Sequence, residues 1–329
     1  MRRLARPLDT LMDRAIWPGY TRLGLAVRRR LPTWPGELPR MEGRTVLVTG
    51  PTSGIGEAAA QRLALLGARV VLLARNPDKG AATQARIQRA VAAEGRTADV
   101  AIVRCDISSL ASVREAVATI EEQDEHVDVL IHNAGAMPPE RTVTDEGYEL
   151  AFATNVLGPF LLTALLEDRL KADAPSRVIT VSSGGMYAQR LDADDLQHAR
   201  RSYSPAAVYA RNKRAQVVLN EGWAERLAGT GVVVHTMHPG WADTPGVQES
   251  LPGFQRLTRR ILRSPDEGAD TIVWLAAAAE PMRTSGRFWA DRRPRPTHYV
   301  RWTREDPEDR AKLWATCAGL AGVDAPVPA

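Results

Sequence analysis

The chain has 329 residues, a mass of 36.0 kDa and a formal net charge of +4. This length allows one large α/β domain or two ordinary ones, and an apolar fraction of 44% excludes wholesale disorder. Two distant cysteines exclude a disulfide-framed scaffold and a cysteine-based zinc cluster, and we expect no metal site. No apolar run reaches about 18 residues and no signal peptide follows the basic start, so we expect a cytoplasmic protein.

The positive charge is concentrated at the start of the chain. Residues 1–40 hold nine arginines against three carboxylates, a net charge of +6, whereas the other 289 residues carry a net charge of −2. A basic tail on a near-neutral body does not indicate nucleic-acid binding. We interpret residues 1–40 as a basic, partly helical N-terminal extension and linker, because several apolar residues fall at helical spacing: Leu4, Leu8, Leu11 and Ile16.

Two hypotheses account for this extension. A basic amphipathic helix favours weak, salt-sensitive contact with an anionic membrane surface, so the protein could be membrane-associated. Alternatively, the helix folds back and buries its apolar residues against the catalytic domain.

From Arg44 onward, short β-branched runs alternate with helical patterns. We expect strands at 45–49, 69–74, 100–105, 127–132, 177–181 and 232–237, and helices at 54–66, 77–93, 109–123, 145–171 and 206–228. This alternation predicts an α/β fold, a Rossmann-type doubly wound parallel sheet in a single catalytic domain over residues 41–291. Residues 292–329 follow as a loop and a final surface helix.

A glycine-rich turn follows the first predicted strand. Glycines allow a tight turn and close approach of a phosphate, and the next helix offers free N–H donors to that anion. We expect cofactor contacts from Gly50, Thr52, Ser53, Gly54, Ile55 and Gly56. The spacing is not G-x-G-x-x-G, so a plain turn is the alternative.

The next two strand ends bear on which nucleotide binds. The second strand ends in Ala74 and Arg75, without the carboxylate that usually accepts from the ribose of NAD. This favours NADP(H) over NAD(H), although Arg75 could be an ordinary surface arginine. After the third strand, Asp106 and Ile107 are placed to contact adenine, but Asp106 could also simply cap the next helix.

Further motifs make the chain resemble the short-chain dehydrogenase/reductase family over about residues 43–290. They occur in family order: the turn Thr49–Gly56, His132–Gly135, Asn155, Ser183, the pair Tyr209 and Lys213, and Pro239–Thr244. The segments SSGGM, YARNKRAQVVL and HPGWADTPGV are similar to the retinol-dehydrogenase-like branch. The Tyr–Lys pair is informative by itself, because the chain has only four lysines and i, i+4 residues share a helix face.

The resemblance implies a role for each catalytic residue. Tyr209 would be the acid/base, Lys213 would lower the pKa of that phenol and bind the nicotinamide ribose, Ser183 would hydrogen-bond the substrate oxygen, and Asn155 would hold a relay water. Ser182 is a rival to Ser183, and Asn155 could instead be a structural amide. The resemblance also implies cofactor contacts from Asn133, Ala134, Gly135, Tyr209, Lys213, Pro239, Gly240, Trp241 and Thr244.

Two features depart from the family pattern. His132 replaces an asparagine, and we expect an interior packing histidine rather than a metal ligand. The interval of 26 residues between Ser183 and Tyr209 is long, so residues 186–205 either border the substrate pocket or form an inert surface loop.

These observations predict an NADP(H)-dependent oxidoreductase that interconverts an alcohol and a ketone or aldehyde. An apolar, lipid-like small molecule is the expected substrate, by analogy and from the apolar stretch at 247–262. The alternative is a nucleotide-binding interaction or sensor protein with little turnover. A homo-oligomer is compatible with either hypothesis.

Overall fold

The computed structural model describes residues 2–328 except 124–125, 244–255 and 257. The side chains of residues 2–6 and 16–17 are outside the description. Thr244 and most of the apolar stretch at 247–262 therefore lie outside the described residues.

One eight-stranded sheet organises the described part of the chain, in the order β3-β2-β1-β4-β5-β6-β7-β8. Strands β1 to β7 are parallel, and β8 runs antiparallel to β7. Their bounds are β1 Thr45–Thr49, β2 Arg69–Ala74, β3 Val100–Arg104, β4 Val129–His132, β5 Ser176–Val181, β6 Val232–Met237, β7 Arg287–Ala290 and β8 Arg293–Arg295. The predicted Rossmann-type sheet is confirmed, and its strand order reverses between β1 and β4, where such folds bind ligands.

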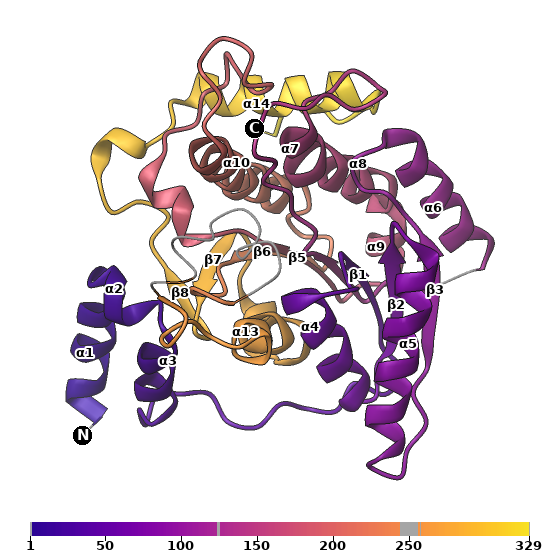
Figure 1. Cartoon of the computed structure of the whole chain (residues 1–329), viewed down its shortest axis with the longest axis vertical. Coiled ribbons are helices and arrows are strands. Elements are labelled where there is room, and N and C mark those ends of the chain that lie inside the picture. The colour runs from indigo at the N-terminus through magenta and orange to yellow at the C-terminus, as the bar shows by residue number, and fades with distance from the viewer. Residues whose placement is uncertain (1, 124–125, 244–255, 257, 329) are drawn as a thin grey trace.

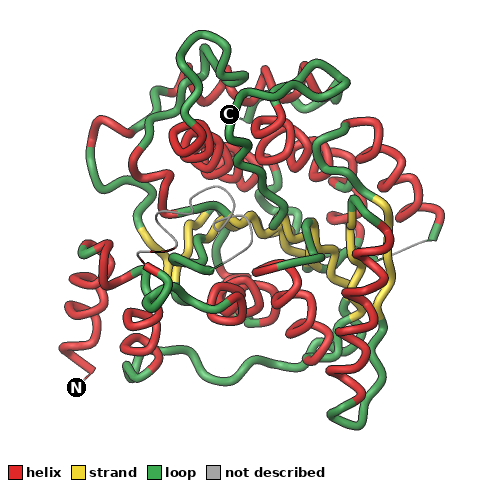
Figure 2. Tube along the Cα trace, viewed as in Figure 1, coloured by secondary structure: helices red, strands yellow, loops and turns green. Residues whose placement is uncertain are grey.

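Helices cover both faces of this sheet, which lies as a yellow layer between two red ones in Figure 2. One face packs against α4 (Gly54–Leu65), α5 (Pro77–Ala92) and α13 (Pro265–Ala277). The other face packs against α6 (Leu110–Glu122), α8 (Gly158–Leu165) and α10 (Pro205–Arg226), with α14 (Pro307–Ala321) outside them. Shorter helical segments are α9 Glu167–Ala172, η2 Gly184–Ala188, η3 Glu280–Arg283 and η4 Arg301–Thr303.

The prediction of one long helix over 145–171 is wrong. The chain instead forms α7 (Leu150–Phe152), the π-helix η1 (Ala153–Leu157), α8 and α9. Pro159, in the first turn of α8, has no N–H to donate to the carbonyl of Asn155 four residues earlier. The π-helical turn is where the regular ladder is interrupted.

The segment after residue 291 contributes to both sheet and core. Asp291 and Arg292 have positive φ values of 51° and 57° and form the tight turn between β7 and β8. On α14, Leu313, Trp314 and Cys317 are fully buried in the same core as α8 and α10. The final helix is therefore a core element on its inner side and not only a surface helix.

The first 30 residues form three helices beside β7 and β8, namely α1 (Arg2–Arg14), α2 (Ile16–Gly19) and α3 (Arg22–Arg29). The extension folds back, as in the second hypothesis, but Leu8 and Leu11 are 41% and 65% exposed, so the folded-back helix does not bury these two apolar side chains. The α1 residues that face the domain are Asp9 and Asp13, both buried. Among the described residues, none of the helices combines the length and apolarity needed to cross a membrane.

Candidate active site

The turn after β1 packs closely against the segment after β4, because two of its glycines leave no space for a Cβ. Gly50 has φ +62°, and a Cβ there would lie 2.8 Å from the Cα of Ala134. A Cβ on Gly56 would lie 2.2 Å from the Nδ2 of Asn133. Helix α4 begins immediately after this turn at Gly54, so its free N–H groups and dipole favour an anion there.

The segment after β4 is hydrogen-bonded to this turn. The N–H groups of Asn133 and Ala134 donate to the Thr49 hydroxyl at 3.0 and 3.1 Å. The Asn133 amide donates to the carbonyls of Thr49 and Gly50 at 3.1 and 3.0 Å. Asn133 therefore fixes the shape of the glycine turn. Within the turn, Ser53 is exposed, whereas Thr52 and Ile55 are half-buried.

The other predicted nucleotide contacts lie at the ends of β2 and β3. Ala74 is buried at the end of β2, and Arg75 after it is exposed and pairs with no described residue. The Asp106 carboxylate accepts from the N–H and hydroxyl of Ser108 at 3.0 and 2.7 Å, whereas Ser109 caps α6. The Ile107 carbonyl packs against Gly158 at the start of α8, where a Cβ on Gly158 would lie 1.9 Å from the carbonyl oxygen.

Tyr209 and Lys213 share one face of α10. The Nζ of Lys213 lies 5.2 Å from the centroid of the Tyr209 ring and donates to the Val181 carbonyl at 2.8 Å. Burial raises the pKa of Tyr209 to about 12 and lowers the pKa of Lys213 to about 7. Burial causes both shifts, because removal from water disfavours each charged form. The lowering of the phenol pKa by Lys213 stays a prediction.

The two candidate serines after β5 have different environments. The Ser182 hydroxyl is buried and donates to the Lys213 carbonyl at 2.9 Å, which ties β5 to α10. The Ser183 hydroxyl is half-buried and accepts from the Gly185 N–H at 3.1 Å. Since an oxygen bound to Ser183 needs a free hydroxyl proton, this geometry favours Ser183 for substrate binding.

Asn155 is fully buried inside η1 and clamps the neighbouring loop. Its amide accepts from the Ala136 N–H at 2.9 Å and donates to the Ala136 carbonyl at 2.8 Å. A Cβ on Gly135 would be 3.2 Å from the Asn155 Oδ1 and 3.7 Å from the Lys213 Nζ, so these groups are neighbours. Both polar atoms of the Asn155 side chain are thus engaged with the backbone of Ala136, beside Lys213.

Gln216, which the sequence analysis did not single out, lies behind Asn155. Its Nε2 donates to the Asn155 carbonyl at 2.6 Å, the group that Pro159 leaves without a helical donor. A cavity of about 30 Å³ beyond it is lined partly by His132 and Asn220. Buried polar atoms of Gln216, Asn220 and His132 without a partner face this region, and the volume admits water.

The segment Pro239–Trp241 is held by a residue that we did not predict, Arg263. Gly240 has φ +76°, and a Cβ there would lie 2.4 Å from the Arg263 guanidinium carbon. Arg263 donates to the Pro239 carbonyl at 3.0 Å, and its own N–H donates to the Trp241 carbonyl at 2.7 Å. No local sequence pattern predicts this contact, because Trp241 and Arg263 are 22 residues apart.

His132 is buried, as expected, and His235 and His238 are buried as well. Burial lowers the pKa of His132 to about 3, and its Nε2 is 2.8 Å from the Thr163 hydroxyl. Burial also lowers the pKa values of His235 and His238, to about 4 and about 3. Within the described part of the chain, no group of three or more His, Cys, Asp or Glu residues could hold a metal ion.

Sequence comparison places these features in one family. The model of the short chain dehydrogenase family matches residues 44–253, which is more than half of the chain. The chain belongs to this family. The short-chain dehydrogenases are oxidoreductases whose fold binds NAD(H) or NADP(H), and the cradle at Gly50 and Gly56 fits that nucleotide.

Curated relatives and solved structures agree with this membership. The chain is 43% identical over 279 residues to human dehydrogenase/reductase SDR family member 12, covering 83% of this chain and 85% of that protein. It is 38% identical over 295 residues to human retinol dehydrogenase 13, covering 86% of each. This confirms its similarity to the retinol-dehydrogenase-like branch of the short-chain dehydrogenases.

Two solved structures share the fold. A crystal structure of a protein from Mycobacterium paratuberculosis has a TM-score of 0.69 and 29% identity, and covers 88% of this chain and 98% of that one. The NADP complex of Pseudomonas aeruginosa RhlG has a TM-score of 0.61 and 26% identity, and covers 76% of this chain and 94% of that one.

Proposed function

We propose that the protein is an NADP(H)-dependent oxidoreductase that interconverts an alcohol and a ketone or aldehyde of an apolar small molecule. The observation that carries this proposal is that Lys213 lies beside the Tyr209 ring and donates to Val181, two residues before Ser183 at the carboxyl end of β5. A pure scaffold has no physical need for all three groups.

In this proposal, Tyr209 moves the proton at the substrate oxygen. Its raised pKa keeps the phenol protonated near neutral pH, which is the form that donates to a carbonyl oxygen. The Ser183 hydroxyl donates to the same oxygen and stabilises the charge that develops on it. Lys213 stands beside the phenol and is the nearest described ammonium that can stabilise tyrosinate after the proton has left. When bound, the nicotinamide supplies or accepts the hydride.

The residues at the end of β2 support NADP(H). Ala74 leaves the ribose without a carboxylate partner, and the guanidinium of Arg75 is exposed and available for a 2′-phosphate. The RhlG structure, which shares the fold, contains NADP.

An apolar substrate is supported by the relatives. The name of retinol dehydrogenase 13 gives a lipid alcohol as the substrate of that protein. Because one extra hydroxyl or methylene shifts affinity only modestly in apolar pockets, a panel is needed rather than one compound.

The test is cofactor oxidation by purified protein against a panel of lipid aldehydes and ketones, with Tyr209→Phe as the control. We expect turnover with NADPH by the parent protein and a loss of roughly a hundredfold or more in Tyr209→Phe, which keeps the ring but lacks the proton. The variant should bind NADPH as the parent does. Tight NADPH binding without turnover of any compound would instead favour the nucleotide-binding sensor hypothesis.

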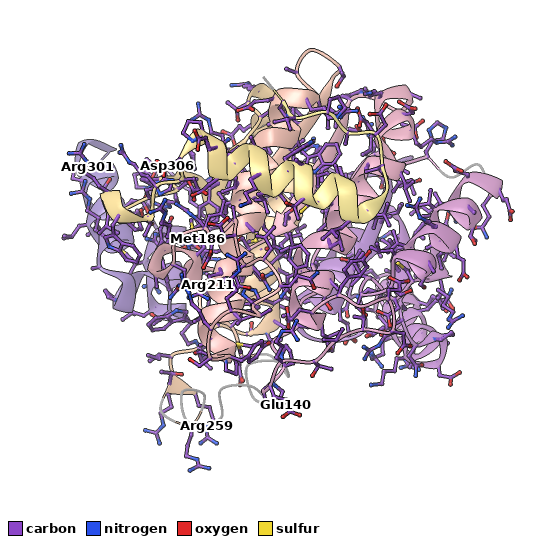
Figure 3. The ribbon with its side chains drawn as sticks, turned by 90° about the horizontal axis from the view of Figure 1, so that it is seen from above. Glu140, Met186, Arg211, Arg259, Arg301 and Asp306 are labelled. Carbon is purple, nitrogen blue, oxygen red and sulfur yellow. The ribbon has the colours of Figure 1, made fainter. Side chains whose placement is uncertain are left out.

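The extension presents a surface suited to weak membrane contact. Leu8, Leu11 and Leu23 are 41%, 65% and 63% exposed. Exposed arginines accompany them: Arg14, Arg22, Arg256, Arg259 and Arg260. Figure 3 shows Arg259 pointing away from the molecule, and the Arg22 N–H donates to the Ile261 carbonyl at 3.0 Å, so these arginines adjoin α3. We infer peripheral, salt-sensitive attachment to anionic lipid through these side chains.

Vesicle co-sedimentation tests this attachment. The parent should bind vesicles with anionic lipid at low salt and be released at high salt, and Leu11→Ser with Leu23→Ser should bind less without losing stability. Equal sedimentation of parent and variant would contradict the contact. A cytoplasmic location and a homo-oligomer stay predictions.

A further inference from the structure

The start of the chain is built into the catalytic end of the molecule. Tyr20, Thr21, Leu25 and Arg28 are almost completely buried, although the sequence places them in an extension outside the family's motifs. In Figure 1 this segment lies against the β7 and β8 side of the sheet. What it touches there defines its role.

The ring of Tyr20 contacts two active-site loops at once. A Cβ on Gly184, the residue after Ser183, would lie 2.7 Å from the Cε2 of Tyr20. The same ring lies edge-on to Trp241, with centroids 6.3 Å apart at 88°. It also packs on His238 at 4.4 Å. One side chain therefore spaces the turn that carries Ser183 from the segment that contains Trp241.

Backbone hydrogen bonds continue this contact. The Trp241 N–H donates to the Tyr20 carbonyl at 2.8 Å. On the other side of Trp241, the Arg263 N–H donates to the Trp241 carbonyl, and the Arg263 guanidinium donates to the carbonyls of Gly19 and Thr21 at 3.2 and 3.3 Å. The segment at Trp241 is thus held between residue 20 and residue 263.

Buried charges fix this arrangement. The Asp291 carboxylate accepts from Arg28 at 2.5 Å and from Arg263 at 2.7 and 3.0 Å, and all three side chains are almost fully buried. Burial alone would raise the pKa of Asp291, but the charges of Arg263 and Arg28 hold it well below its usual range. Separating these groups would leave buried charges unpaired, so the extension is firmly docked.

We propose that Tyr20 is a positioning residue for the reaction, which holds the Ser183 turn and the segment at Trp241 at the spacing that the bound nicotinamide and substrate require. The proposal rests on the proposed function, because it assumes that these two loops flank the nicotinamide. The catalytic geometry then depends on a segment outside the dinucleotide-binding core.

The test combines cofactor affinity, turnover and a rescue. Tyr20→Leu removes the ring, and we expect weaker NADPH binding and a kcat lower by roughly tenfold, since small misplacements at a reacting centre are costly. Tyr20→Phe should resemble the parent, because the Tyr20 hydroxyl lies within hydrogen-bonding geometry of none of the described residues and the ring makes the contacts. Gly184→Ala should lower both NADPH affinity and kcat, because the added methyl group collides with the Tyr20 ring. The double variant Gly184→Ala with Tyr20→Leu should recover part of that affinity and kcat.

Trp314→Leu is the matched control for stability. Trp314 is an equally buried aromatic residue that packs on Trp223 and Phe160, in a core cluster that contains neither Tyr20 nor Trp241. Trp314→Leu should lower Tm and leave NADPH affinity and kcat unchanged in the folded protein.

Two results overturn the proposal: Tyr20→Leu with parental affinity and kcat, or Gly184→Ala defects that Tyr20→Leu does not relieve. A parent that binds neither NADPH nor NADH would instead contradict the proposed function. NADPH affinity, measured by protein fluorescence, separates these cases because it requires no substrate.

Discussion

The ammonium of Lys213 is hydrogen-bonded to the carbonyl of Val181 and lies under the ring of Tyr209, 5.2 Å from its centroid. The lysine is buried with one backbone acceptor, and none of the described carboxylates pairs with it. This environment accounts for a pKa lowered to about 7 by burial.

A consequence is a measurable link between pH and stability. Between pH 7 and about 10.5, the unfolded chain holds a proton on Lys213 that the folded chain has released. Unfolding therefore takes up a proton, and the contribution of this group to the free energy of unfolding rises with pH across that window. Lys213→Met removes this contribution. Without cofactor, we compare the free energies of unfolding of the parent and of Lys213→Met in denaturant titrations. The parent value minus the variant value should rise by up to about 1.4 kcal/mol per pH unit across this window. A difference that does not vary with pH would show that the buried lysine stays charged.

Cofactor preference should depend on Arg75. Arg75→Ala should weaken NADPH binding by roughly tenfold, as expected for loss of a charge-assisted hydrogen bond, and leave NADH unchanged. Ala74→Asp should act in the same direction through repulsion of the 2′-phosphate. Arg89→Ala, an exposed arginine near the other end of α5, is the control. Equal affinities of the parent for NADPH and NADH would contradict the assignment.

Gln216 should matter because of Pro159. Gln216→Met has similar volume but cannot donate to the Asn155 carbonyl, and leaving that buried group unpaired should cost about 1–3 kcal/mol of unfolding free energy. Pro159→Ala returns an N–H to the helix, so the same substitution should cost less in that background. A double-mutant cycle by chemical denaturation measures the difference. Full additivity would mean that Gln216 does not replace the missing donor.

Asp291 should be among the most sensitive residues for stability. Asp291→Asn keeps a residue that tolerates the positive φ but leaves Arg263 without a described carboxylate partner and Arg28 with Asp9 alone. We therefore expect the free energy of unfolding to fall by about 3 kcal/mol at pH 7. Because the folded pKa is lowered, this contribution is complete above pH 3.8 and is lost as the pH falls through the folded value. Asp168→Ala, whose side chain is fully exposed, should change stability by less than about 0.5 kcal/mol. Thermal unfolding at pH 7 and pH 3 compares the two.

The features predicted correctly from sequence are those with local causes. Strands β1 to β6 follow from apolar runs, the tight turn after β1 from its glycines, and the position of Lys213 beside Tyr209 from helical periodicity. The break near Pro159 was also a local signal, but the apolar pattern on both sides concealed it.

The other features depend on contacts between distant residues. The burial of Asp9 and Asp13 against Arg295 and Tyr299 reverses the usual preference of apolar residues for the interior, so hydrophobic periodicity oriented α1 wrongly. The roles of Tyr20 and Arg263 depend on the loops that they contact in the folded protein. Neither residue belongs to a motif, so the sequence alone did not identify them.

The contacts of α1 also bear on the order in which the protein completes its structure during synthesis. Asp9 pairs with Arg295, and Asp13 pairs with Tyr299, each 286 positions later in the chain. During synthesis these two contacts can form only after Arg295 and Tyr299 have left the ribosome. Helix α1 can therefore dock only after residues 295–299 have been made. A chain that stops before residue 290 would contain every motif residue yet lack the partners that seat Tyr20 beside the Ser183 turn.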